Sequence, residues 1–168
     1  MIDMHGIYTE EHGKFQIDLR KTIWSKGDLK STFETIGSVQ NDADWMFEEE
    51  ACFILVEFKN WDKGEMPVNA ELFYQSIARK YYGSAYYLYA LGVSKPINFL
   101  LVLAAPFVDE FMKNKALASI RKRLPFELQK RPEFPNTLIE CFDIYSVSDW
   151  NEAYPMYPIS NLDIKELL

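Results

Sequence analysis

Hydrophobic and polar positions follow two patterns along this chain, and both are typical of β-strands. Residues 14–24 and residues 137–147 alternate between apolar and polar side chains, as strands do when one face is buried. Residues 51–58 and residues 97–104 are almost continuously apolar, which fits strands buried on both faces. A short apolar stretch at residues 44–47 adds another strand. The hydrophobic pattern therefore predicts a sheet with well-buried central strands.

Apolar residues also recur at helical spacing. The strongest case is residues 68–91, where Asn69 is a candidate N-cap and Gly92 follows as a stop signal. A second helix is predicted over residues 109–123. Residues 28–37 are ambiguous and fit a short helix.

The order of these elements predicts the fold class. The acidic break between residues 44–47 and residues 51–58 makes this pair antiparallel, and the helix over residues 68–91 is long enough to cross over to a parallel strand. The chain is therefore expected to form an α/β or α+β domain with a mixed sheet over residues 1–148. Residues 149–168 are expected to form an aromatic and proline-rich tail with a short helix, packed on its own domain or on a partner.

Composition narrows the class of protein. The chain has 168 residues, of which 48% are hydrophobic and 26% charged, so it can bury a core within one domain. Its net charge of -7 argues against binding nucleic acid through bulk charge, but leaves room for a local basic patch. Cys52 and Cys141 are far apart within apolar runs, which favours reduced thiols in the cytoplasm. No basic region followed by an apolar stretch opens the chain, and its longest apolar run is shorter than the roughly 20 residues of a bilayer span.

One segment carries candidate chemistry, the apolar run that ends in Glu57, Phe58 and Lys59. Side chains alternate along a strand, so Glu57 and Lys59 share a face about 7 Å apart, while Phe58 points to the other face. A carboxylate and an ammonium group are thus presented together where a buried strand emerges.

An upstream acid reaches the same place if the loop between the two strands has an even number of residues. Such a loop would place Phe47 opposite Cys52. Asp42 would then lie opposite Glu57, with Asp44 as its diagonal neighbour on the same face. An odd loop would turn both aspartates to the other face.

Two converging carboxylates repel each other unless a hard divalent cation such as Mg²⁺ lies between them. A cation so held polarises a phosphate oxygen and lowers the pKa of a bound water. Lys59 would stabilise developing charge or help to deprotonate the water. These parts fit metal-assisted phosphodiester hydrolysis.

The sequence DWMF from Asp44, followed by ILVEFK with Glu57 and Lys59, resembles the core motif of the PD-(D/E)XK nuclease superfamily. The resemblance covers residues 14–104 and implies the restriction-endonuclease-like fold, a three-layer domain with a central mixed β-sheet flanked by helices. It also implies a nuclease activity but not a substrate; the expected substrate is DNA rather than RNA. Asp44, Glu57 and the main-chain carbonyl of Phe58 would hold Mg²⁺ or Mn²⁺, and Lys59 would serve the attacking water.

Other positions match the family less closely. Members often add a polar residue from the following helix, for which Gln75 and Arg79, one turn apart, are the candidates. Many members carry a glutamate in an N-terminal helix, and Glu34 is the available match. Ala43 stands where the family motif has proline.

Basic residues are concentrated in residues 113–131. Seven basic side chains accompany one acid, Glu127, so the segment has a net charge of +6 and leaves -13 on the rest of the chain. Such segregation could form a patch that follows phosphates, or simply a solvated helix face. The candidate nucleic-acid-binding residues are Arg79, Lys113, Lys115, Arg121, Lys122 and Arg123.

Tyr82, Tyr86 and Tyr89 share one face of the long helix, where packing against the sheet is favoured over base stacking. The chain has no Gly-rich phosphate loop and no Gly-x-Ser-x-Gly, which excludes the common NTPase and α/β-hydrolase motifs. A second class of function stays open, a nuclease-fold protein without catalysis that serves as a binding or assembly module. Its expected partners are a second copy or another subunit.

Overall fold

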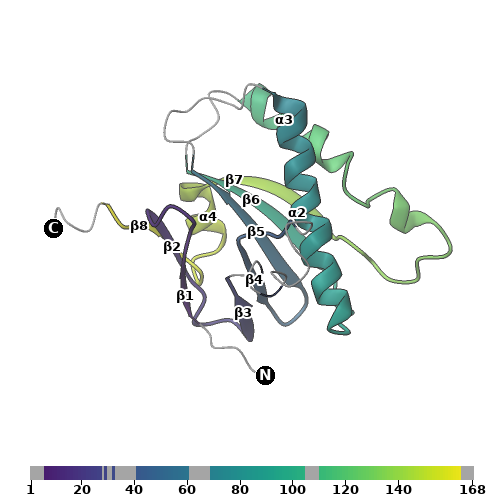
Figure 1. The fold of residues 1–168 in the computed structure, drawn as a ribbon, viewed down its shortest axis with the longest axis horizontal. Helices are drawn as coiled ribbons and strands as arrows, with labels where there is room; N and C mark the ends of the chain where they lie inside the picture. The colour runs from purple at the N-terminus through teal and green to yellow at the C-terminus, as the bar shows by residue number, and fades with distance from the viewer. Residues whose placement is uncertain are drawn as a thin grey trace.

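The computed structural model describes residues 6–27, 29, 32, 41–60, 69–104 and 110–163. Two sheets and the helices around them form three layers (Figure 1). The central sheet has the strand order β3 (Trp24–Lys26), β4 (Trp45–Glu48), β5 (Phe53–Lys59), β6 (Ile97–Leu103) and β7 (Cys141–Ser146). One face is covered by α2 (Ala70–Ala90) and α3 (Glu110–Arg121). The other is covered by α4 (Val147–Ala153) and a smaller sheet of β1 (Ile7–Thr9), β2 (Phe15–Asp18) and β8 (Ile159–Asn161).

Strand directions in the central sheet are mixed, as expected. β4 runs antiparallel to β3 and β5, whereas β5, β6 and β7 are parallel. The helix α2 is the crossover between β5 and β6. It begins where the Asn69 side chain accepts the N–H of Leu72, and Gly92 follows its end with φ of 79°. The predicted α+β domain with a central mixed sheet flanked by helices is confirmed.

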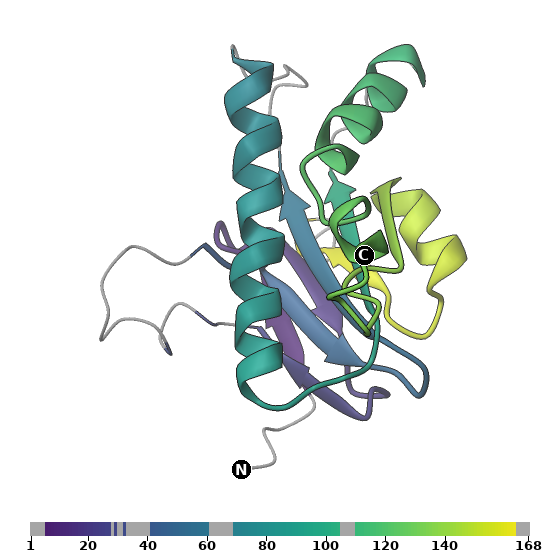
Figure 2. The ribbon, with the colours of Figure 1, turned by 90° about the vertical axis from the view of Figure 1, so that its right-hand side faces the viewer.

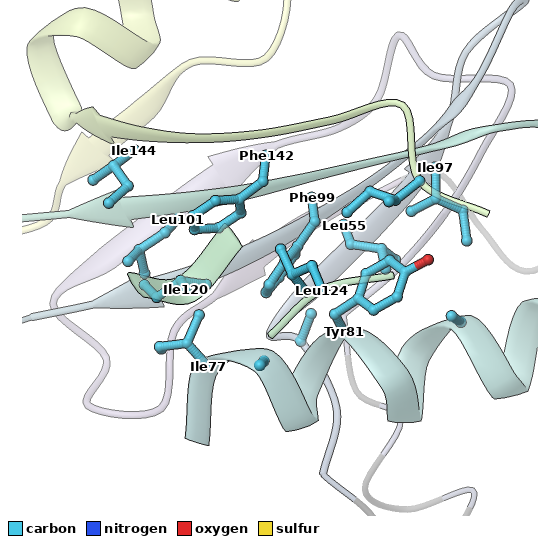
Figure 3. Packing of buried hydrophobic residues seen from close by; sticks show 14 of the residues in the cluster. Leu55, Ile77, Tyr81, Ile97, Phe99, Leu101, Ile120, Leu124, Phe142 and Ile144 are labelled. Carbon is cyan, nitrogen blue, oxygen red and sulfur yellow. The ribbon is translucent and has the colours of Figure 1, made fainter. Parts of the chain in front are cut away.

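Alternate positions of β5 and β6 face the helices. Leu55, Phe99 and Leu101 pack there against Ile77 and Tyr81 of α2 (Figure 3). All five side chains are at most 1% exposed. Burying a side chain of this size stabilises the fold by about 1.5–3 kcal/mol, so this contact fixes α2 firmly on the sheet.

The intervening positions of the same strands face the smaller sheet. Val56 and Phe58 pack there with Ile17 of β2 and with Trp150 of α4. The Trp150 indole is completely buried and donates a hydrogen bond to the carbonyl of Tyr157. The segment that contains α4 and β8 is therefore part of the same packed unit.

The prediction of one strand over residues 14–24 is wrong. β2 and β3 belong to different sheets, with a turn between them. The N–H and the hydroxyl of Thr22 both donate to the carbonyl of Leu19, and these bonds reverse the chain. Alternation of apolar and polar residues continues through this turn and therefore hides it.

The last central strand is shorter than the predicted strand over residues 137–147. In the first part of that segment, hydrogen bonds to a side chain take the place of pairing with a neighbouring strand. Gln129, in the 3₁₀-helix η2 (Leu128–Lys130), accepts the N–H groups of Leu138 and Ile139 and donates to the carbonyl of Ile139. Regular pairing begins only at Cys141.

Ser160 does not begin a helix, because it pairs with β2 as part of β8. Residues 164–168 lie outside the described part of the chain. The predicted helix over residues 28–37, which includes Glu34, also lies outside the described part, except for residues 29 and 32. None of the helices in the described segments is long and apolar enough to cross a membrane.

Candidate functional site

The register of the β4–β5 hairpin brings the early acid to the later one. Glu48 pairs with Phe53, so four residues form the loop, and their even number is the condition under which the upstream aspartates share a face with Glu57. The pairing is shifted by two positions from the expected register. Continued by one residue beyond β4, it places Asp44 rather than Asp42 opposite Glu57.

Glu57 and Lys59 lie on the face of β5 that is covered by α2. They follow Leu55, which packs against that helix, at intervals of two residues. Glu57 is completely buried, whereas the Lys59 side chain is 30% exposed at the end of the strand. The predicted pair therefore joins a buried carboxylate to a lysine whose side chain is partly exposed.

Two ammonium groups approach the Glu57 carboxylate. Lys59 Nζ lies 2.6 Å from Oε1, and Nζ of Lys80 on α2 lies 3.1 Å from Oε2. Both carboxylate oxygens are buried, and each has one ammonium group as its close partner. Two ion pairs therefore hold this carboxylate.

Burial raises the pKa of Glu57 to about 7, and the nearby charge of Asp44 adds to the rise, against the opposing effect of Lys59 and Lys80. The pKa of Lys80 is shifted down by burial and up by Glu57 and Asp44, and the net direction is upward. At neutral pH, Lys80 is charged while Glu57 is close to its titration midpoint. A carboxylate poised in this way is common at functional sites.

Asp44 is joined to β5 by its side chain. Its Oδ2 accepts the main-chain N–H of Phe58 at 2.8 Å. The N–H and the carbonyl of one residue in a strand point to the same edge, so the Phe58 carbonyl also lies on the side of Asp44. The two carboxylates and the carbonyl that the family resemblance assigns to a metal are therefore neighbours.

These donors fit a hard divalent cation, because all of them are oxygen atoms and two are carboxylates. The negative charge of Asp44 beside the buried Glu57, which helps to raise the Glu57 pKa, supports the fit, because a cation between the two acids would relieve their repulsion. Among the residues with described positions, no three His, Cys, Asp or Glu side chains gather into a metal site. The candidate metal ligands in this region are therefore Asp44, Glu57 and the main-chain carbonyl of Phe58.

Two residues of α2 that sequence reasoning missed also reach this site. Lys80 donates to the carbonyl of Asp42 at 3.1 Å, and Ser84 accepts the N–H of Ala43 at 2.8 Å. Lys80 lies three residues after Ile77, and Ser84 lies three residues after Tyr81. Both apolar side chains belong to the stripe of α2 that faces the sheet. Polar residues within such a stripe are the signal that would have found them.

Gln75 and Arg79 are not brought to the site. Both are exposed, on the side of α2 opposite Ile77. The 3.6-residue period of the helix turns these positions away from the sheet when residues 77 and 81 face it. Lys80 and Ser84, rather than either candidate, are the polar residues of α2 that reach the site.

The basic segment is divided between structural pairs and exposed groups. Arg123 forms an ion pair with Glu71 of α2, and the Arg121 guanidinium lies 3.9 Å from the centre of the Phe126 ring. Further along the chain, Lys130 pairs with Glu127 and Arg131 with Glu133. Lys115, Arg121 and Lys122 are exposed, whereas Lys113 and Arg123 are partly buried. In Figure 2, α3 lies beside α2 and beyond the carboxyl ends of β5 and β6. Lys59 is the last residue of β5, and Glu57 lies two residues before it.

The expectation that three tyrosines of α2 pack against the sheet is wrong. Tyr82, Tyr86 and Tyr89 are 40–63% exposed, because Tyr81 occupies the stripe that faces β6. The hydroxyl of Tyr82 donates to the Arg123 carbonyl, and that of Tyr89 donates to the carbonyl of residue 138. Two of the three tyrosines therefore connect α2 to the segment after α3.

Comparison of the chain with protein-family models, with curated proteins and with solved structures gives no match. The resemblance to the PD-(D/E)XK nucleases thus rests on the motif and on the placement of its residues.

Proposed function

We propose that this chain is a divalent-metal-dependent phosphodiester hydrolase that cleaves nucleic acid, with DNA preferred over RNA. One observation carries the proposal: the completely buried Glu57 lies at the end of β5 beside a second acid, Asp44, and two ammonium groups. An arrangement that raises a carboxylate pKa by burial and by a like charge favours a functional site. The motif resemblance supplies the reaction class, and DNA rather than RNA is the expected substrate.

Each residue has a distinct role in this proposal. Asp44, Glu57 and the carbonyl of Phe58 would hold Mg²⁺ or Mn²⁺, which supplies Lewis-acid polarisation of a phosphate and a more acidic water. Lys59 is partly exposed at the end of the strand, so its ammonium group can contact a phosphate from solvent. It would stabilise the negative charge that develops on the phosphate or help to deprotonate the attacking water.

The exposed basic residues of the α3 region support a polyanionic substrate. A chain with a net charge of -7 repels nucleic acid on average, so binding requires a local basic surface. Lys115 and Arg121 on α3, next to α2, and Lys122 directly after α3 supply three exposed cations. Contacts of this kind position a phosphate backbone without reading its sequence.

Cleavage assays with matched variants test the proposal. Supercoiled plasmid, single-stranded DNA and RNA are incubated with Mg²⁺, Mn²⁺ or a chelator. We expect metal-dependent cleavage of DNA, and a loss of about 10²-fold or more in Asp44→Ala and Lys59→Ala, both remaining folded by circular dichroism. Lys95→Ala is the control, because Lys95 pairs with Glu48 at the other end of the sheet. Full activity in both site variants would refute the proposal.

A non-catalytic binding or assembly module is the second candidate. Its support is the charge balance at Glu57, because two lysines already neutralise two acids there without a metal. Calorimetric titration with Mn²⁺ separates the two candidates. Binding at millimolar concentration or tighter supports the hydrolase, whereas absence of both binding and cleavage favours the module.

A further inference from the structure

One peptide group next to the site is held at both ends by α2. The carbonyl of Asp42 accepts a hydrogen bond from Lys80, and the N–H of Ala43 donates to Ser84. These two atoms belong to the same peptide bond, and in a trans peptide they point in opposite directions. Lys80 and Ser84 are four residues apart, about 6 Å along the helix axis. The peptide group therefore lies along α2, between the two side chains.

The next residue is Asp44, so the position of this peptide group determines the main-chain position of Asp44. The Asp44 carboxylate is in turn held by the N–H of Phe58. Asp44 is thus fixed from two directions, through its main chain by α2 and through its side chain by β5. Ser84 is completely buried and Ala43 is 2% exposed, so water does not compete for the bond between them.

We infer that Ser84 and Lys80 are positioning residues that place Asp44 against Glu57. The inference rests on the proposed function, because it assigns to α2 the geometry of the proposed metal site. Lys80 also contacts Glu57 and changes its charge environment. Ser84 accepts the main-chain N–H of Ala43 and carries no charge, so its replacement tests the positioning effect without changing the charge near Glu57.

Metal affinity measures this effect directly. The dissociation constant of Mn²⁺ alone is determined by calorimetry for the wild type, for Ser84→Ala and for Ser84→Thr, which keeps the hydroxyl. We expect Ser84→Ala to bind Mn²⁺ about 10- to 100-fold more weakly, with affinity recovered in Ser84→Thr. Ser76→Ala is the control on the same helix, because the Ser76 hydroxyl donates to the carbonyl of Phe73 within α2. Unchanged affinity in Ser84→Ala would overturn the inference.

A second readout does not depend on the metal. The Phe58 amide is protected by Asp44, so its hydrogen exchange should be faster in Ser84→Ala and in Lys80→Met than in the wild type. The Leu101 amide, in the centre of β6, reports the stability of the whole fold. An equal acceleration at Leu101 would mean that these residues only stabilise the fold, and would overturn the inference. If the wild type binds no Mn²⁺, the proposed function fails, while the exchange at Phe58 still tests the positioning role.

Discussion

Replacing Glu57 by glutamine should remove a pH dependence from the stability of the fold. Burial raises the pKa of Glu57 from 4.5 to about 7, so between these values the native state binds more protons than the unfolded state. The free energy of unfolding therefore falls as the pH rises through this window. A shift of this size corresponds to up to about 3 kcal/mol, lost between pH 5 and pH 8. The raised pKa of Lys80 and the lowered pKa values of Asp18 and Asp149 act outside this window.

Urea unfolding at pH 5 and pH 8, in the presence of a chelator, measures this difference. Glu57→Gln should have nearly the same free energy of unfolding at both pH values. Glu48→Gln is the matched control, because Glu48 lies on the neighbouring strand β4 and pairs with Lys95 in the loop before β6. Its replacement should leave the pH dependence of unfolding as in the wild type. Mg²⁺ at tenfold its dissociation constant should restore about 1.4 kcal/mol to the wild type at pH 8, and nothing to Glu57→Gln. A wild type that is equally stable at pH 5 and pH 8 would refute the reasoning.

Three further predictions concern the fold and the basic surface. Gly27→Ala should destabilise the protein by about 1–3 kcal/mol in urea unfolding, because its Cβ would lie 2.1 Å from the Tyr8 ring; an unchanged midpoint would contradict this. Gln129→Leu removes three hydrogen bonds to the segment before β7 and should speed amide exchange there, whereas wild-type protection would show that the bonds are dispensable. Lys115→Ala and Lys122→Ala should each lower the slope of log affinity for DNA against log salt by about 1, and an unchanged slope would place the DNA elsewhere.

Local rules were sufficient for the part of the site that lies on one strand. The two-residue period of a strand placed Glu57 and Lys59 on one face, and β5 has that arrangement. Parity of the hairpin loop placed the upstream aspartates on the same face, but it could not choose between Asp42 and Asp44. That choice depends on a shift of two residues, which preserves every buried face and therefore leaves no trace in the hydrophobic pattern.

The contribution of α2 could not be derived in the same way. Contact between Lys80 and Glu57 depends on how the helix is rotated and shifted over the sheet, which is set by packing around Ile77 and Tyr81. Gln75 and Arg79 were chosen for their spacing alone, and the same packing turns them to solvent. A rule that seeks polar residues inside an apolar helical stripe would have selected Lys80 instead.

The charges around Glu57 give a physical reason to expect chemistry at this position rather than stability. Removing a carboxylate from water is costly, and ion pairs in the interior often stabilise a fold no better than apolar side chains of similar volume. The neighbouring positions on this face of β5, Phe53 and Leu55, are apolar and well packed. On the proposed function, Asp44 and Glu57 would bind a divalent cation. The positive charges of Lys59 and Lys80 would then no longer be balanced by the two acids. The local charge would then be positive, which attracts a phosphodiester, whereas the balanced set of two acids and two lysines does not.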